Sequence, residues 1–205
     1  MSDYKNLLKL FQQLEPLQKE TEQVAKGLDA AALNETRNAT HHLLIALCES
    51  SKCDDEIKKA VNHTKRAIYD CHEAMLLREL DKFKVFKEDY KNIVITDVIA
   101  DYVIRCQQAE AAKDKITAIR QLDVKHAGDD DKKYSPDRNK LYDDIAPFLN
   151  EIKQNNKHFE QARPELNKII RREFKEGRKA IWKVVGFLVA TAVGLLAWLL
   201  PNSPT

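Results

Sequence analysis

Apolar or near-apolar residues recur along most of the chain at alternating intervals of three and four positions, the spacing of helices that pack against other helices. The first stretch has seven such positions: Leu7, Leu10, Leu14, Leu17, Thr21, Val24 and Leu28. Pro16 lies within this stretch and is expected to kink or start the helix. A second helix is predicted from about Ala30 to Cys48, because Gly27 and Asp29 precede it as capping signals.

A third helix is predicted to begin near Ser50 and Ser51, with Asp54 and Asp55 in its first turn. Its apolar seam is regular and consists of Ile57, Val61, Thr64, Ile68, Cys71 and Met75. The same spacing predicts a further helix that carries Ile95, Ile99, Tyr102, Cys106 and Ala109.

The run Gly128-Asp129-Asp130-Asp131 interrupts the helical pattern and predicts an acidic surface loop, which ends at a helix start at Ser135 and Pro136. Beyond it, heptad spacing continues across Pro164 and predicts a kinked but nearly continuous stalk helix. The seam positions are Phe148, Ile152, Asn155, Phe159, Ala162, Leu166 and Ile169. Asn155 would either fix the register or the oligomer number from within the seam, or lie partly exposed.

The C-terminal segment is apolar on all sides. Residues 184–200 carry no charge, and together with Ile181 and Trp182 they give about 30 Å of helix, the thickness of a bilayer core. Trp182 and Trp198 lie near the two ends of this segment, as an aromatic belt does, and Lys183 can snorkel to the interface. We therefore predict a transmembrane helix over residues 181–200; the alternative is a buried core helix.

A basic collar precedes this segment: Lys168, Arg171, Arg172, Lys175, Arg178 and Lys179. Residues 201–205 carry no charge, so the positive-inside rule predicts a single-pass protein whose N-terminal domain is cytoplasmic, with tail-anchored topology.

Three small residues, Gly186, Ala190 and Gly194, recur every four positions within the predicted span and lie on one face, which lets neighbouring helices approach closely. A homo-oligomer is the functional interpretation, although Gly and Ala are also common in spans that do not associate. Because Thr191 is the only polar residue between Val184 and Leu200, a pore built from this helix would gate by wetting and dewetting.

Composition supports an all-α fold. The 205 residues include only 5 glycines, too few for the turns of sandwiches, barrels and glycine-rich phosphate loops. The formal net charge of +2 gives no global basic field for bulk nucleic-acid binding. We expect a helical cytosolic domain over residues 1–127, an acidic loop over 128–135, stalk helices with the basic collar over 136–180, the transmembrane helix over 181–200 and a short tail over 201–205.

The sequence predicts no metal site and no cofactor. Cys48, Cys53, His63 and the pair Cys71-His72 are spaced like no standard zinc module, and we expect the four cysteines to be reduced thiols, since no signal peptide precedes them. Motifs of nucleotide hydrolysis, redox chemistry and serine or zinc hydrolases are missing from the sequence. The sequence therefore does not decide whether the protein is an enzyme, although the missing motifs favour a protein that is not one.

Polar residues that could carry chemistry are concentrated in two segments, 36–42 and 63–73. On the predicted third helix four of them share a face beside the apolar seam: His63, Arg66, Asp70 and Glu73. Arg37 and His41 share a face of the second helix, so if the two faces meet, Asp70 or Glu73 could pair with Arg37 and orient a histidine. The alternative for the third helix is a solvated stripe of charges.

The spacing Arg37-x4-His42, with Asn38 beside the arginine, resembles the Arg-Asn-x(3–5)-His signature of HEPN domains, which are all-α and often RNA-cleaving dimers. The resemblance covers only this motif. It implies that Arg37 steadies a phosphate and that His42 acts in acid-base cleavage at the 2′-OH of RNA.

The layout of a helical cytosolic domain followed by a single span resembles the small membrane effectors of bacterial anti-phage systems, including Hailong-like ones, in which a receptor domain gates a pore or disrupts the inner membrane. The resemblance implies an inner-membrane location and a nucleotide or nucleic-acid oligomer as ligand. Its phosphate and stacking contacts would be Arg37, His41, His42, Lys65, Arg66 and Tyr69. We therefore expect an oligomeric membrane effector; the alternatives are a membrane-tethered ribonuclease and a tail-anchored scaffold.

Overall fold

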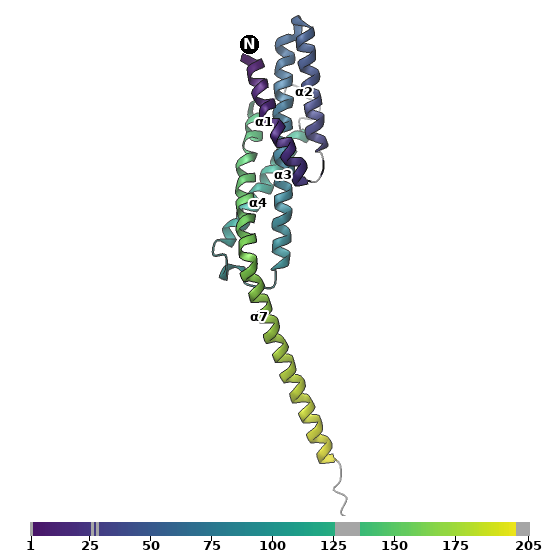
Figure 1. Ribbon diagram of the computed structural model, residues 1–205, viewed down its shortest axis with the longest axis vertical. Coiled ribbons are helices and arrows are strands. Elements are labelled where there is room, and N and C mark those ends of the chain that lie inside the picture. The colour runs from purple at the N-terminus through teal and green to yellow at the C-terminus, as the bar shows by residue number, and fades with distance from the viewer. Residues whose placement is uncertain (1, 26, 28, 126–135, 200–205) are drawn as a thin grey trace, which may run out of the picture.

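The computed structural model describes residues 2–25, 27, 29–125 and 136–199, and over these residues the chain is all-helical, as predicted. The main helices are α1 (Ser2–Ala25), α2 (Ala30–Cys48), α3 (Cys53–Asp89), α4 (Tyr102–Lys125), α6 (Pro136–Asp143) and α7 (Ile145–Leu199). Two short 3₁₀ turns, η1 (Ser50–Lys52) and η2 (Ile95–Asp97), lie before α3 and α4. Together they form an elongated body from which α7 projects (Figure 1).

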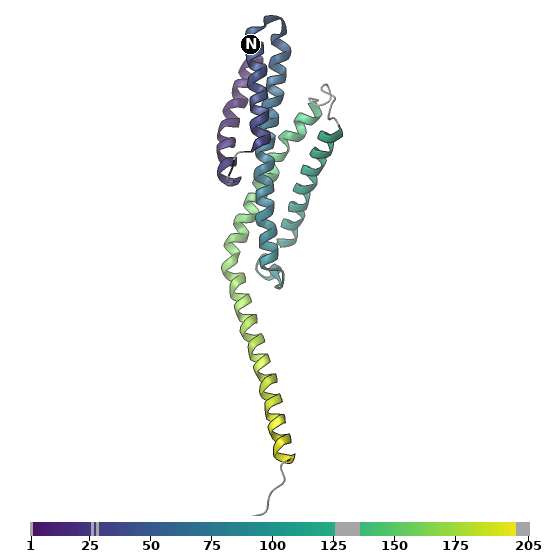
Figure 2. The same cartoon turned by 90° about the vertical axis from the view of Figure 1, so that its right-hand side faces the viewer.

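Helix α3 is the central element and runs the full length of the body in both views (Figures 1 and 2). Its 37 residues include no Gly and no Pro, so nothing in its sequence interrupts the helical hydrogen bonds. Asp54, Asp55 and Glu56 lie in its first turn and Lys87 in its last, the charge distribution that the helix dipole favours.

The N-terminal half of α3 packs against α1 and α2. Alanines at intervals of seven, Ala32, Ala39 and Ala46, form the buried face of α2 and let its backbone approach α3 closely. The start of α2 is capped as predicted, because the Asp29 carboxylate accepts a hydrogen bond of 2.8 Å from the backbone N–H of Ala32.

The C-terminal half of α3 packs against α4, α6 and the part of α7 up to Leu166, and this interface contains the largest core. Aromatic rings fill its lower part: the Phe86 and Phe159 rings stack with their centroids 4.5 Å apart, and the Phe83 and Phe159 centroids are 5.3 Å apart. Buried aliphatic residues such as Ile119 and Ile152 continue the core upward. The stalk seam predicted from the sequence is therefore, in this part, an intramolecular core.

Helix α7 continues through Pro164 without a break, as the heptad spacing predicts. Asn155 lies within the seam and is buried, and its amide is bonded inside the chain: its Oδ1 accepts from Arg105 of α4 and its Nδ2 donates to Gln108 at 2.8 Å. This geometry accounts for a buried Asn without a second copy of the chain.

Below the body, α7 extends alone (Figure 2), and every side chain from residue 171 to 192 is exposed. In the part of the chain that the structure describes, no helix contains a run of residues long and apolar enough to cross a membrane. The predicted span over 181–200 extends beyond the described side chains, which end at residue 192. Gly186 and Ala190 are exposed on α7, whereas the side-chain position of residue 194, the acidic loop over 128–135 and the tail over 201–205 lie outside the described residues.

One predicted helix begins later than expected. Ile95 and Ile99 are buried as their spacing requires, but Ile95 belongs to the 3₁₀ turn η2 and helix α4 begins only at Tyr102. The segment contains four consecutive β-branched residues, Ile93 to Thr96, which have low helix propensity, and Val94 has an extended backbone.

Candidate functional site

The six residues predicted to bind a ligand fall in two separate places. Arg37, His41 and His42 lie on α2, and Lys65, Arg66 and Tyr69 lie farther along α3. Of the first three only His42 turns toward α3, whereas Arg37 and His41 are exposed. The second three face α1 and α6 instead, so the structure does not join all six in one site.

At the interface of α2 and α3 two histidines each bind a glutamate of the other helix. His42 Nδ1 lies 2.6 Å from Glu56 Oε2, and His63 Nδ1 lies 2.5 Å from Glu35 Oε2. The two imidazole rings stack with centroids 5.1 Å apart and planes 10° apart. We call these four residues the histidine cluster.

The histidine cluster follows from a simple register. Glu35 and His42 are seven positions apart on α2, and Glu56 and His63 are seven positions apart on α3, so each pair spans two helical turns and shares a face. Because the two helices run in opposite directions (Figure 1), each histidine meets the glutamate of the other helix. Lys59 also donates to Glu56 at 2.7 Å, and these hydrogen bonds lower the pKa of the Glu56 carboxyl below its usual value.

The pairing expected for Arg37 does not form. Asp70 binds Arg66 of its own helix at 2.9 Å, and Glu73 binds Arg120 of α4 at 2.6 Å. The solvated stripe that was the alternative is not observed either, because His63, Asp70 and Glu73 are all buried. This face of α3 therefore fastens α3 to its neighbours α2 and α4.

Arg66 is the centre of a polar network that joins α3 to α6. Its Nη1 donates to the Tyr142 hydroxyl at 2.7 Å, and its guanidinium lies 5.0 Å and 5.2 Å from the ring centroids of Tyr69 and Tyr142. The two tyrosine rings are in contact, with centroids 4.6 Å apart. Burial raises the pKa of the partner carboxyl, Asp70, to about 7, although the Arg66 charge opposes that shift.

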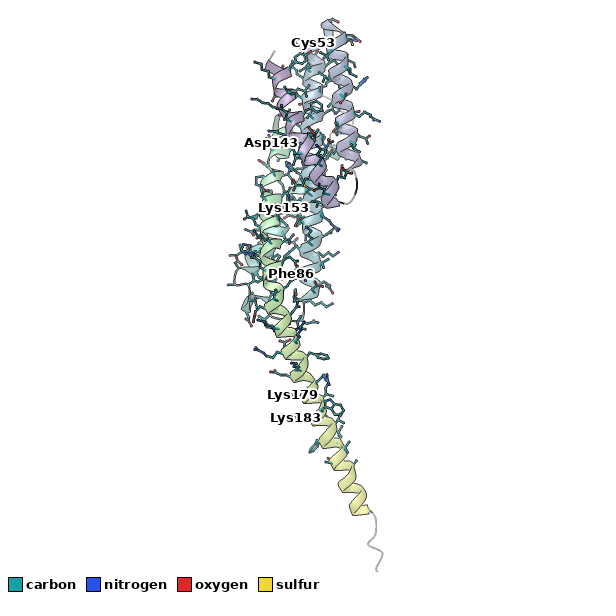
Figure 3. The ribbon with its side chains drawn as sticks, in the orientation of Figure 1. Cys53, Phe86, Asp143, Lys153, Lys179 and Lys183 are labelled. Atoms are coloured by element: carbon teal, nitrogen blue, oxygen red, sulfur yellow. The ribbon has the colours of Figure 1, made fainter. Side chains whose placement is uncertain are left out.

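A cleft of about 600 Å³ opens beside this network, between α1, α3, α6 and the first turn of α7. It is of the size that small organic ligands occupy. Its polar lining is Gln12, Gln13, Lys65, His72, Tyr142 and Asp143, the last labelled in Figure 3. Its apolar lining includes Leu10, Pro16, Ile68 and Ala146. Burial lowers the pKa of His72, which favours the neutral imidazole there.

Lys65 and Tyr69 line this cleft, and Arg66 fixes its Tyr142 wall, so three of the six predicted ligand residues belong to it. Sequence reasoning missed Tyr142, which lies 76 positions from Arg66, and the carboxylates Glu35 and Glu56. The seven-residue spacing of Glu35 with His42 was a usable signal for the glutamates; nothing local pointed to Tyr142.

Among the described residues no group of three or more His, Cys, Asp or Glu side chains could hold a metal ion. The four cysteines are free thiols, and burial raises the pKa of Cys71 to about 11, so this thiol is a poor nucleophile at neutral pH.

No protein-family model matches this sequence, and neither do any of the curated proteins or solved structures with which the chain was compared. We therefore infer function from the side chains and their geometry.

Proposed function

We propose that the protein is an oligomeric, single-span membrane effector: its helical body sits on the cytoplasmic face, senses a ligand and gates a pore or a disruption of the inner membrane through α7. A role in anti-phage defence fits the resemblance in layout noted above. The proposal rests on residues 181–200 as the span.

The observation that carries the proposal is the exposed end of α7. Trp182 and Phe187 are 67% and 72% exposed, and Ile181, Leu188 and Val189 are similarly bare. Monomeric soluble proteins seldom leave a continuous apolar surface of this kind uncovered. A bilayer would cover this helix on all sides, which suits a segment whose apolar residues are not confined to one face.

The cleft is the best candidate for the ligand site because α7 begins in its wall. Ala146 lines the cleft and Tyr142 precedes it by one turn, while the other end of the same helix is the proposed span. The 55 residues of α7 correspond to about 80 Å of unbroken helix. A ligand that moves the start of α7 against α1 would therefore displace the far end, and Lys65 supplies a cation for a phosphate or other anionic group.

The test is the membrane potential of bacterial cells, read with a voltage-sensitive dye, that express equal amounts of the full chain or of a chain ending at Arg178. We expect only the full chain to depolarise the cells. Alkaline carbonate extraction of the same membranes reports insertion independently. If the full chain is inserted but never depolarises, it is an anchored scaffold; if carbonate releases it, residues 181–200 are not a span.

A second candidate, a membrane-tethered ribonuclease, is favoured by the pairing of His42 with Glu56. A carboxylate on Nδ1 holds the imidazole in one orientation and leaves Nε2 for proton transfer, and the His42 side chain retains 20% exposure. Arg37 lies on a different side of α2, about 140° around the helix from His42, so it does not supply a phosphate contact beside this histidine. In this case His42→Ala abolishes cleavage of a single-stranded RNA, and truncation after Arg178 does not; a chain that never cleaves RNA removes this candidate.

A further inference from the structure

The segment of α7 between the body and the proposed span carries six basic residues: Lys168, Arg171, Arg172, Lys175, Arg178 and Lys179. All are exposed, and α7 is continuous through them, so their angular positions follow from helical geometry. At about 100° per residue the six fall within about 120° of the helix circumference. We call this surface the basic face; Lys179 marks its lower end in Figure 3.

The other sides of the segment have a different character. Glu173 points away from the basic face, Glu176 lies at its edge next to Arg172, and the exposed Ile170 and Phe174 lie on a third side. A helix that only needed solubility would mix its charges and pair them at intervals of three or four. Here Glu173 has no basic residue at these intervals, and Glu176, which has Arg172 and Lys179 at them, forms no ion pair within the described residues.

Within the described residues, the basic face has one ion pair, between Lys168 and Glu165 at 2.9 Å. That pair is at the end nearest the body. Arg171, Arg172, Lys175, Arg178 and Lys179 have no acidic side chain within ion-pairing distance in that part of the chain. The segment therefore presents unneutralised positive charge directly beside the apolar end of the helix.

We propose that the basic face binds the headgroups of anionic phospholipids at the bilayer surface from which α7 enters the membrane. This inference rests on the proposed function, because it requires residues 181–200 to lie in the bilayer. Basic clusters of this size beside a span bind anionic lipid, and each Lys or Arg near the surface raises the affinity about fivefold.

Distance divides the basic face into two groups. Lys175, Arg178 and Lys179 lie two to six positions before Ile181, within about 9 Å along the helix axis. Lys168, Arg171 and Arg172 lie nine to thirteen positions before Ile181, about 14 to 20 Å along the axis, beyond the Debye length of about 8 Å at physiological salt. A lipid surface therefore engages the first group strongly and the second weakly, whereas an elongated polyanion such as RNA would engage both alike.

The experiment measures flotation of the full chain, synthesised in the presence of vesicles, on phosphatidylcholine alone or on equal parts of phosphatidylcholine and phosphatidylglycerol. We expect the anionic vesicles to be preferred at low salt and the preference to shrink as salt is added. The triple variant Lys175→Gln, Arg178→Gln and Lys179→Gln should lower the preference for anionic over neutral vesicles by about 100-fold, because each lost charge contributes about fivefold.

Two matched variants of the same segment serve as controls. Lys168→Gln with Arg171→Gln and Arg172→Gln removes the same number of charges farther from the span and changes the preference only a few fold. Glu173→Gln with Glu176→Gln leaves the preference intact or raises it slightly.

An equal loss from both basic triples, or tighter binding of single-stranded RNA than of anionic vesicles, overturns the proposal in favour of a polyanion. Carbonate resistance separates the two hypotheses. A chain that inserts equally well into both kinds of vesicle refutes the lipid preference and leaves the span standing; a chain that inserts into neither refutes both.

Discussion

The buried carboxyl of Asp70 gives the sharpest prediction about stability. Burial raises the pKa of this group from 3.8 to about 7, against the opposing charge of Arg66 at 2.9 Å. The folded protein therefore keeps a proton on Asp70 at pH values where the unfolded chain has lost it. Since the pKa is raised on folding, the stabilisation is complete below the unfolded pKa and is lost as the pH rises to the folded pKa.

The magnitude follows from the width of that window. Between about pH 5 and about pH 7 the unfolded carboxyl is ionised and the folded one is protonated. The free energy of unfolding therefore falls by about 1.4 kcal/mol for each pH unit, about 3 kcal/mol over the two units. Above about pH 7 the contribution is constant. Asp70→Asn keeps an oxygen that accepts from Arg66 Nε but cannot ionise, and its stability should not fall in this window.

The assay is urea denaturation of the full chain in a mild detergent, followed by circular dichroism at about pH 5 and about pH 8. We expect Asp70→Asn to gain about 3 kcal/mol relative to the unmodified chain between the two conditions. Comparing variants at each pH cancels other titrating groups such as His72. Asp81→Asn, an exposed aspartate of the same helix, is the control and should change nothing. An equal pH dependence in the Asp70→Asn and unmodified chains would refute the reasoning.

Three further substitutions test the packing by the same denaturation assay. Phe159→Ala removes a ring at the centre of the aromatic stack and should lower the free energy of unfolding by about 3 to 5 kcal/mol. A decrease of less than about 1 kcal/mol would mean that the rings are not packed as described. Asn156→Ala removes two hydrogen bonds to the backbone and carboxylate oxygens of the buried Glu79 and leaves its carboxylate only the ion pair with Lys82, so it should cost about 1 to 3 kcal/mol. Asp29→Ala removes the cap of α2 and should cost about 1 kcal/mol, whereas Asp29→Asn should cost little.

Periodicity predicted the helices well where local and tertiary preferences agree. Asp29 caps α2 and the helix ends at Cys48, as the capping residue and the apolar pattern indicate. The spacing failed at residues 95–101, because a 3₁₀ turn followed by a helix can bury Ile95 and Ile99 just as one helix would. Apolar positions report which residues are buried, and backbone propensity decides the local conformation.

The candidate site was harder to predict because proximity in the sequence is a poor guide to proximity across a bundle. Arg37 and His42 are close in sequence yet lie on different sides of α2, since five residues turn a helix by about 140°. Tyr142 was absent from the prediction although Arg66 holds it directly, because their meeting depends on how α6 docks on α3. Long-range pairs of this kind produce no recognisable pattern in the sequence of either helix.

The length of α3 has a consequence for how the molecule comes apart. Its N-terminal half supplies the core shared with α1 and α2, and its C-terminal half supplies the core shared with α4 and α7, with no break between them. A boundary between the two bundles would have to cut a helix, so neither can melt without exposing part of the other's core. We expect a single cooperative unfolding transition, in which the amides at the middle of α3 exchange with solvent last.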